Sequence, residues 1–120
     1  MTIYQEVILD HSAKPRNVGS IPDATGSVQV HNPLCGDKLK MDVLVENGKL
    51  VDIKFMPKGC AISKASASLL SEHIKGKTVI ELKKITKKDI MKLLGIDLGP
   101  NRVKCALLPL EALHKLLISL

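Results

Sequence analysis

Aromatic side chains are almost absent from this 120-residue chain, which has one tyrosine, one phenylalanine and no tryptophan. Proteins that bind single-stranded nucleic acid stack its bases on aromatic rings, so this class is disfavoured despite a net charge of +6. The basic surface instead suits an acidic protein, another anionic partner, or solvent alone. The core must be aliphatic, and leucine, isoleucine, valine and alanine are plentiful.

Long apolar runs are also missing. No stretch approaches the ~20 apolar residues of a membrane span. The first residues carry Glu6 and Asp10 inside their apolar pattern, which is unlike a secretory signal. The three cysteines cannot all pair with one another, and none forms a C-x-x-C step. We therefore expect a cytoplasmic protein with no membrane partner, whose reduced thiols serve metal or sulfur chemistry.

Alternating apolar residues predict three antiparallel strands. Residues 26–32 form the first strand. In the second, Met41, Val43 and Val45 alternate with Asp42, Leu44 and Glu46, and Asn47-Gly48 is a strong two-residue hairpin signal. Val51, Ile53 and Phe55 are then expected to face the core from the return strand.

Helical patterns flank this sheet. Thr2 is expected to cap a first helix, residues 61–75 to form a helix that starts at Cys60, and Thr86 to cap a helix that Gly95 closes. A last helix runs toward Leu120. Pro109 lacks an N–H, so we expect this helix to begin no earlier than about Cys105. The pattern predicts one α+β domain over residues 1–120, a three-stranded antiparallel sheet packed by several helices with the functional site at one end.

Three cysteines and one aspartate are the candidate ligands. Cys35 and Asp37 lie in the turn NPLCGD, Cys60 follows 25 residues after Cys35, and Cys105 follows 45 residues later. Three thiolates and a carboxylate suit a soft or borderline metal or an iron–sulfur cluster. A hard carboxylate among thiolates would leave one edge of a cluster loosely held. The expected helix starts at Cys60 and Cys105 would favour the thiolate at both.

Simpler interpretations stay open for each candidate. Cys60 and Cys105 could be packed as small apolar residues, and Asp37 could only cap its turn. Lys104 could pair with Asp37 or be an ordinary surface lysine. The four histidines are expected at the surface rather than as ligands: His11, His31, His73 and His114.

The segments YQEVILDHSAKPRN, NPLCGD, GCAISKASAS and RVKCALLPLEAL together resemble the U-type iron–sulfur cluster assembly scaffolds, the IscU/NifU N-terminal family. By matching position the resemblance implies that Cys35, Asp37, Cys60 and Cys105 bind the cofactor. Lys104 stands where the Isc-type branch has a histidine. Residues 98–104 replace that branch's chaperone-binding LPPVK-like segment, and residues 102–105 are closer to the Suf-type branch.

The resemblance implies a scaffold rather than an enzyme. A 2Fe–2S cluster would be assembled from iron and from sulfur supplied by a cysteine desulfurase, and then passed to apo iron–sulfur acceptor proteins. One alternative is a Suf-type sulfur acceptor with Zn²⁺ on the same four residues. Another is a closed structural zinc domain. Self-association into a homo-oligomer stays open.

Overall fold

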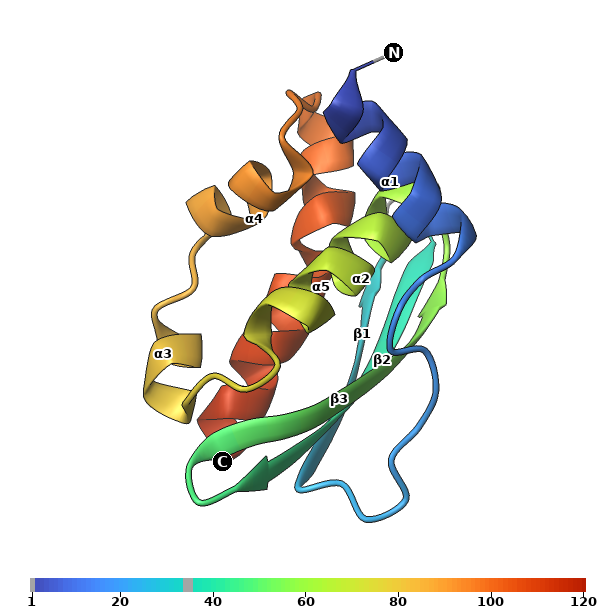
Figure 1. The fold of residues 1–120 in the computed structure, drawn as a ribbon. Helices are drawn as coiled ribbons and strands as arrows, with labels where there is room; N and C mark the ends of the chain where they lie inside the picture. Colours follow the sequence, from blue (N-terminus) through green and yellow to red (C-terminus); the bar gives the residue numbers. More distant parts are fainter. Residues whose placement is uncertain (1, 34–35) are drawn as a thin grey trace.

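A three-stranded antiparallel sheet forms one layer of the molecule, and helices pack against it as the other (Figure 1). The computed structural model describes residues 2–33 and 36–120. The strands are β1 (Gly26–Asn32), β2 (Asp37–Glu46) and β3 (Lys49–Lys58), in the order β1-β2-β3. The predicted α+β fold is confirmed.

The hairpin between β2 and β3 forms where the sequence predicts it. Asn47 and Gly48 have φ values of 53° and 75°. Positive φ at both central residues gives a tight turn the twist that antiparallel strands need, which is why Asn-Gly suits this position.

One part of the predicted alternation is wrong. Val51 is 38% exposed, whereas its neighbour Leu50 is 1% exposed and lies in the core. The register explains the exchange, because Leu44 pairs with Asp52 and Val45 pairs with Leu50, which leaves Val51 without a partner across the ladder. A β-bulge of this kind shifts the inward face by one residue.

Four helices precede the last one: α1 (Ile3–Ala13), α2 (Ala61–Ile74), α3 (Val79–Lys83) and α4 (Lys87–Leu94). Thr2 caps α1, Thr86 caps α4 and Gly95 ends α4 with a φ of 69°, as predicted. The sequence analysis missed α3. Its signal was present, because Thr78 and Glu81 form a reciprocal capping box at its start.

The last helix, α5 (Pro100–Ser119), begins about five residues earlier than predicted. Pro100 occupies the first turn, where a missing N–H costs nothing, and Gly99 is the N-cap. Pro109 lies inside the helix and cannot donate to the carbonyl of Cys105. The Ser66 hydroxyl donates to the next carbonyl, that of Ala106, at 2.6 Å. Burial of α5 and this bond stabilise the helix through the proline.

The core lies between the sheet and the helix pair α2 and α5, with α1 packed on the outside of α2. Small residues of α2 (Ala65, Ser66, Ala67 and Ser68) are buried and allow this close packing, as the sequence predicts. No helix in the described part of the chain has the length and apolar character needed to cross a membrane.

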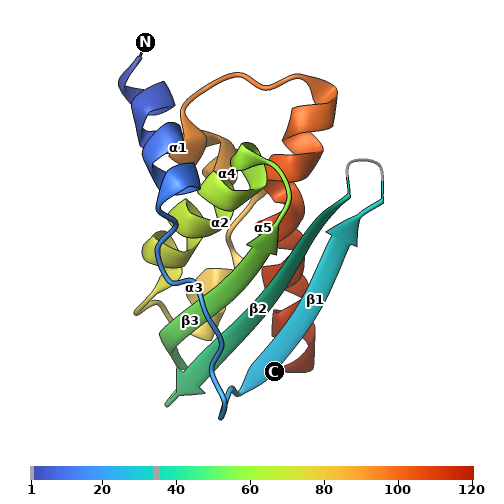
Figure 2. The ribbon, with the colours of Figure 1, turned by 90° about the vertical axis from the view of Figure 1, so that its right-hand side faces the viewer.

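Three segments distant in sequence meet at one end of the molecule. These are the β1–β2 turn, the start of α2 and the first turns of α5 (Figure 2). All four predicted ligands belong to these segments.

Candidate metal centre

Three of the four predicted ligands come together at this end of the fold. One carboxylate oxygen of Asp37 and the sulfur atoms of Cys60 and Cys105 all lie within 4.8 Å of one another. They come from the start of β2, the cap of α2 and the second turn of α5. Cys35, the fourth predicted ligand, lies outside the described residues.

Asp37 is 1% exposed, so its carboxylate must be compensated inside the protein. Its Oδ1 accepts a hydrogen bond from the backbone N–H of Cys60 at 2.8 Å. Its Oδ2 lies 3.5 Å from the Cys60 sulfur and accepts from that thiol. Asp37 therefore does more than cap its own turn: it connects the start of β2 to the start of α2.

Gly59 makes room for this carboxylate. Its φ of 145° is one that residues with a side chain rarely adopt, and a Cβ there would stand 3.0 Å from the Asp37 Cα and collide with the carboxylate. We expected Gly59 to let a bulky ligand approach the backbone. The structure shows that the group it admits is the Asp37 side chain.

Cys60 is the N-cap of α2 and is half-buried, as the predicted helix start requires. Its side chain makes no capping hydrogen bond, so its sulfur remains directed to the cluster of ligands rather than to the helix backbone. The partial positive charge at a helix N-terminus stabilises an anion there. This favours a thiolate at Cys60.

Cys105 does not share this environment. It is 4% exposed and lies inside α5, so the prediction that it sits at a helix N-terminus is wrong. The error follows from placing Pro109 in the first turn. What positions Cys105 is the packing of α5 over the sheet, which turns its sulfur toward Asp37 and Cys60.

The donor set has a definite chemical preference. Two thiols are soft ligands, and one carboxylate is hard. Tetrahedral zinc and iron–sulfur clusters both accept thiolates with an oxygen or nitrogen donor, and both need a fourth ligand here. Thiolates are poor ligands for Mg²⁺ or Ca²⁺, which prefer oxygen. The residues present fit zinc or an iron–sulfur cluster.

A hollow of about 370 Å³ adjoins this site between α5 and the end of β1. Lys104 is exposed and lines it together with His31 and Glu111. Pairing of Lys104 with Asp37 stays a prediction.

The histidines stay away from the three described ligands. His31, His73 and His114 are exposed, as expected. His11 is the exception, because it is buried and its Nδ1 lies 2.6 Å from the Ser68 hydroxyl. Burial lowers the pKa of His11 below its ordinary value, and the nearby Arg16 guanidinium lowers it further.

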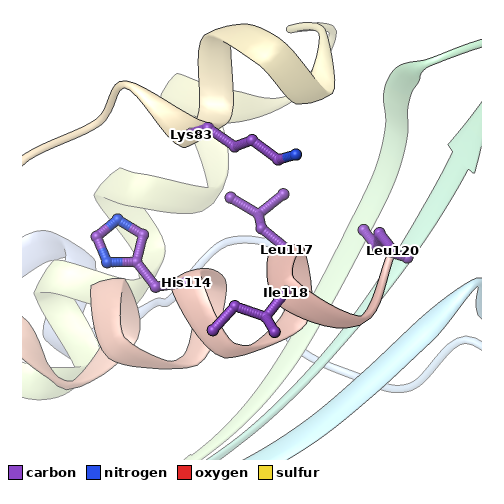
Figure 3. Close-up of a pocket in the computed structure, with 5 residues that line it drawn as sticks. All are labelled: Lys83, His114, Leu117, Ile118 and Leu120. Carbon is purple, nitrogen blue, oxygen red and sulfur yellow. The ribbon is translucent and has the colours of Figure 1, made fainter.

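Another hollow lies at the far end of α5, away from the cysteines (Figure 3). Its lining is mostly aliphatic, with one lysine and one histidine: Lys83, His114, Leu117, Ile118 and Leu120. These residues supply neither a thiolate nor a carboxylate, so this hollow is not a second site of the same chemistry.

Known proteins share this sequence and fold. The family model described as the NifU-like N-terminal domain matches residues 3–119. The chain is 38% identical over 117 residues to the iron–sulfur cluster assembly scaffold protein IscU 1 of Archaeoglobus fulgidus, covering 98% of this chain and 76% of that protein. It is 37% identical over 131 aligned positions to the zinc-dependent sulfurtransferase SufU of Bacillus subtilis, covering 95% and 88%.

A solved structure agrees. The crystal structure described as an iron–sulfur cluster assembly scaffold protein for the SUF system of Fervidobacterium islandicum matches with a TM-score of 0.82 and 32% identity. The match covers 93% of this chain and 94% of that one. The chain therefore belongs to the family of NifU-like N-terminal domains.

Proposed function

We propose that this protein is a scaffold on which a 2Fe–2S cluster is assembled and from which it is passed to apo-proteins. The observation that carries the proposal is the convergence of Asp37, Cys60 and Cys105 within 4.8 Å at one end of the fold. Relatives named as cluster assembly scaffolds support it. The cluster is cargo in this proposal, so the protein carries a product rather than catalysing a reaction.

The ligands in this proposal are Cys35, Asp37, Cys60 and Cys105, on a single domain of residues 1–120 in the cytoplasm. Iron enters among the thiolates, and a cysteine desulfurase supplies the sulfur. A thiolate of the scaffold attacks the outer sulfur of the desulfurase persulfide. A new S–S bond forms, and the desulfurase cysteine leaves as a thiolate. Cys60 is half-buried and Cys105 is buried, so Cys60 is the more accessible of these two thiols.

Asp37 supplies the property that distinguishes a scaffold from a permanent cluster protein. A carboxylate binds iron less firmly than a thiolate does in a sulfur-rich site. The Asp37 oxygens are also engaged by the N–H and the thiol of Cys60, so the carboxylate has alternative partners when it leaves the cluster. The cluster should therefore open at Asp37 when an acceptor protein approaches.

The alternative is a zinc-bound sulfur acceptor on the same residues. The similarity to a zinc-dependent sulfurtransferase favours it, and the donor set suits zinc equally well. In that case one cysteine would leave the zinc ion to take sulfur from the desulfurase.

Anaerobic reconstitution separates the two functions. The protein is incubated with ferrous iron, cysteine and a cysteine desulfurase, and bound iron, bound zinc and acid-labile sulfide are then counted per chain. A scaffold binds iron and sulfide in equal amounts and becomes brown. A zinc-bound sulfur acceptor retains zinc, stays colourless and contains no acid-labile sulfide. Cys105→Ser serves as the control, since it should bind neither cargo stably.

A further inference from the structure

The outer face of the sheet carries a row of basic residues next to the metal centre. His31 on β1 pairs with Lys38 on β2, and Lys38 pairs with Lys58 on β3. All three side chains are exposed. Because side chains alternate across a strand, this row faces away from the helices, while the next residue of β2, Asp37, faces the metal centre.

This row works against the stability of the sheet. Like charges directly opposite each other on neighbouring strands repel. Lys38 and Lys58 form such a pair, and none of the ion pairs found in the described residues involves either lysine. Local features that oppose the fold are expected where a surface has another use.

An apolar side chain lies beside the row. In the next register position Lys40 pairs with Met56, which is 51% exposed. We call His31, Lys38, Lys40, Met56 and Lys58 the sheet-end patch. Protein interfaces are enriched in methionine at their centre and carry charges around it. Figure 2 shows this end of the sheet lying in front of α5, with the β1–β2 turn above it.

We propose that the sheet-end patch is the docking surface for an acidic protein that exchanges cargo with the metal centre. The charge of the patch is complementary to a cluster of carboxylates, and Met56 provides an apolar contact within it. The position of Lys38 and Lys58, one and two residues from Asp37 and Cys60, brings the bound protein to the metal centre. The inference rests on the proposed function for the cargo, but the docking itself is measured separately.

Nucleic acid and membranes fit this patch less well. The patch contains no aromatic side chain on which a base could stack. It lies on a sheet face with one exposed apolar residue, whereas an interfacial membrane anchor presents a broad apolar face with its cations. A protein with an acidic surface is therefore the occupant that this chemistry favours.

Charge reversal on the patch tests the proposal. The probe is an apo-ferredoxin of strongly negative net charge, and its association with the scaffold is followed by stopped-flow fluorescence at low and high salt. Lys38→Glu/Lys58→Glu should slow association at low salt by roughly tenfold or more, because electrostatic steering contributes factors of this size. Lys87→Glu/Lys88→Glu on α4 changes the net charge equally and should alter the rate less than about twofold.

A single variant separates docking from folding. Lys58→Glu replaces the repelling pair by an attractive one, so its urea unfolding midpoint should rise while association slows. A midpoint and a rate that fall together would make the lysines structural and overturn the proposal. Equal effects of the sheet and α4 double variants would also overturn it, because net charge alone would then explain the rates.

Two further measurements complete the test. Iron and sulfide content after reconstitution should be unchanged in both double variants, so a scaffold that fails to form a cluster would contradict the proposed function and leave the docking result readable. Duplex DNA and vesicles containing phosphatidylserine are titrated in parallel. Loss of their binding in Lys38→Glu/Lys58→Glu, with ferredoxin association unaffected, would assign the patch to nucleic acid or lipid and overturn the proposal.

Discussion

The backbone N–H of Cys60 donates a hydrogen bond to Oδ1 of Asp37 at 2.8 Å. This bond joins the first residue of β2 to the cap of α2, across 23 residues of chain. Asp37 thus has two roles in our account, as a ligand and as the acceptor that positions Cys60. Substitutions of Asp37 can separate these roles.

Asp37→Ala should slow cluster transfer to an apo-ferredoxin and leave the cluster more persistent on the scaffold. The hard ligand is removed, and with it the point at which the cluster opens. Asp37→Asn keeps an oxygen that accepts from the Cys60 N–H but removes the charge, so it should retain the geometry of Cys60 better than Asp37→Ala. Transfer is followed by circular dichroism in the visible range. Equal or faster cluster loss from Asp37→Ala would show that Asp37 does not supply lability.

Gly59→Ala should destabilise the fold and damage the metal centre together. A methyl group at this position collides with the Asp37 carboxylate, and the backbone strain alone is expected to cost about 1–3 kcal/mol. Gly48→Ala is the matched control: its φ is also positive, at 75°, but a Cβ there meets no atom of the described residues within 4 Å. It should lose stability while binding zinc normally. Wild-type zinc affinity in Gly59→Ala would contradict the role given to Gly59.

Cys60→Ala and Cys105→Ala should each prevent a stable cluster, but they should differ in their effect on folding. Cys60 is half-buried at a helix cap, and its side chain makes no capping bond, so its removal should change the unfolding free energy little. Cys105 is packed inside α5, and its removal should cost about 1–2 kcal/mol for the buried atoms lost. Urea unfolding and visible absorbance measure both effects. A variant that still binds a full cluster would remove that cysteine from the ligand set.

The buried His11 should make stability fall below neutral pH. Its pKa in the folded protein lies below the ordinary value of 6.5, mainly because burial disfavours the charged ring. Above pH 6.5 both states hold a neutral ring, and the stability is complete. As the pH falls below that value, the unfolded chain binds a proton that the folded protein resists, so the unfolding free energy decreases.

His11→Asn measures this effect directly. Asparagine retains a polar atom near the Ser68 hydroxyl and does not titrate, so its unfolding free energy should change less than that of the wild type between about pH 7.5 and about pH 5.5. His73→Asn is the control, because His73 is exposed and its removal should leave the wild-type pH dependence in place. Identical pH dependence in His11→Asn and wild type would show that His11 does not contribute.

Local signals in the sequence predicted most of the fold. Thr2, Thr86, Gly95 and the Asn47-Gly48 turn act within a few residues of themselves, and each stands where it was predicted. The failures depended on distant contacts. The β-bulge at Val51 follows from its pairing with β2, and the true start of α5 depends on burial that tolerates Pro109.

The site was predictable in composition but not in geometry. The motif residues named Asp37, Cys60 and Cys105 as ligands, and the structure brings them together. Nothing local indicated that Cys105 would lie inside a helix, or that Gly59 would face Asp37 rather than a ligand. The sheet-end patch was equally hidden, since Lys38 and Lys58 become neighbours only through the register of β2 and β3.

A scaffold must hand over the cluster that it has assembled, intact. The direct test loads the protein anaerobically with isotopically labelled iron and sulfur, removes excess reagents, and mixes it with an unlabelled apo-ferredoxin in the presence of an iron chelator. Labelled iron and labelled sulfide should appear in the ferredoxin in equal amounts, at the rate at which the scaffold loses its visible absorbance. Interception of the iron by the chelator, or a scaffold that carries labelled sulfur but zinc in place of iron, would contradict the proposed function.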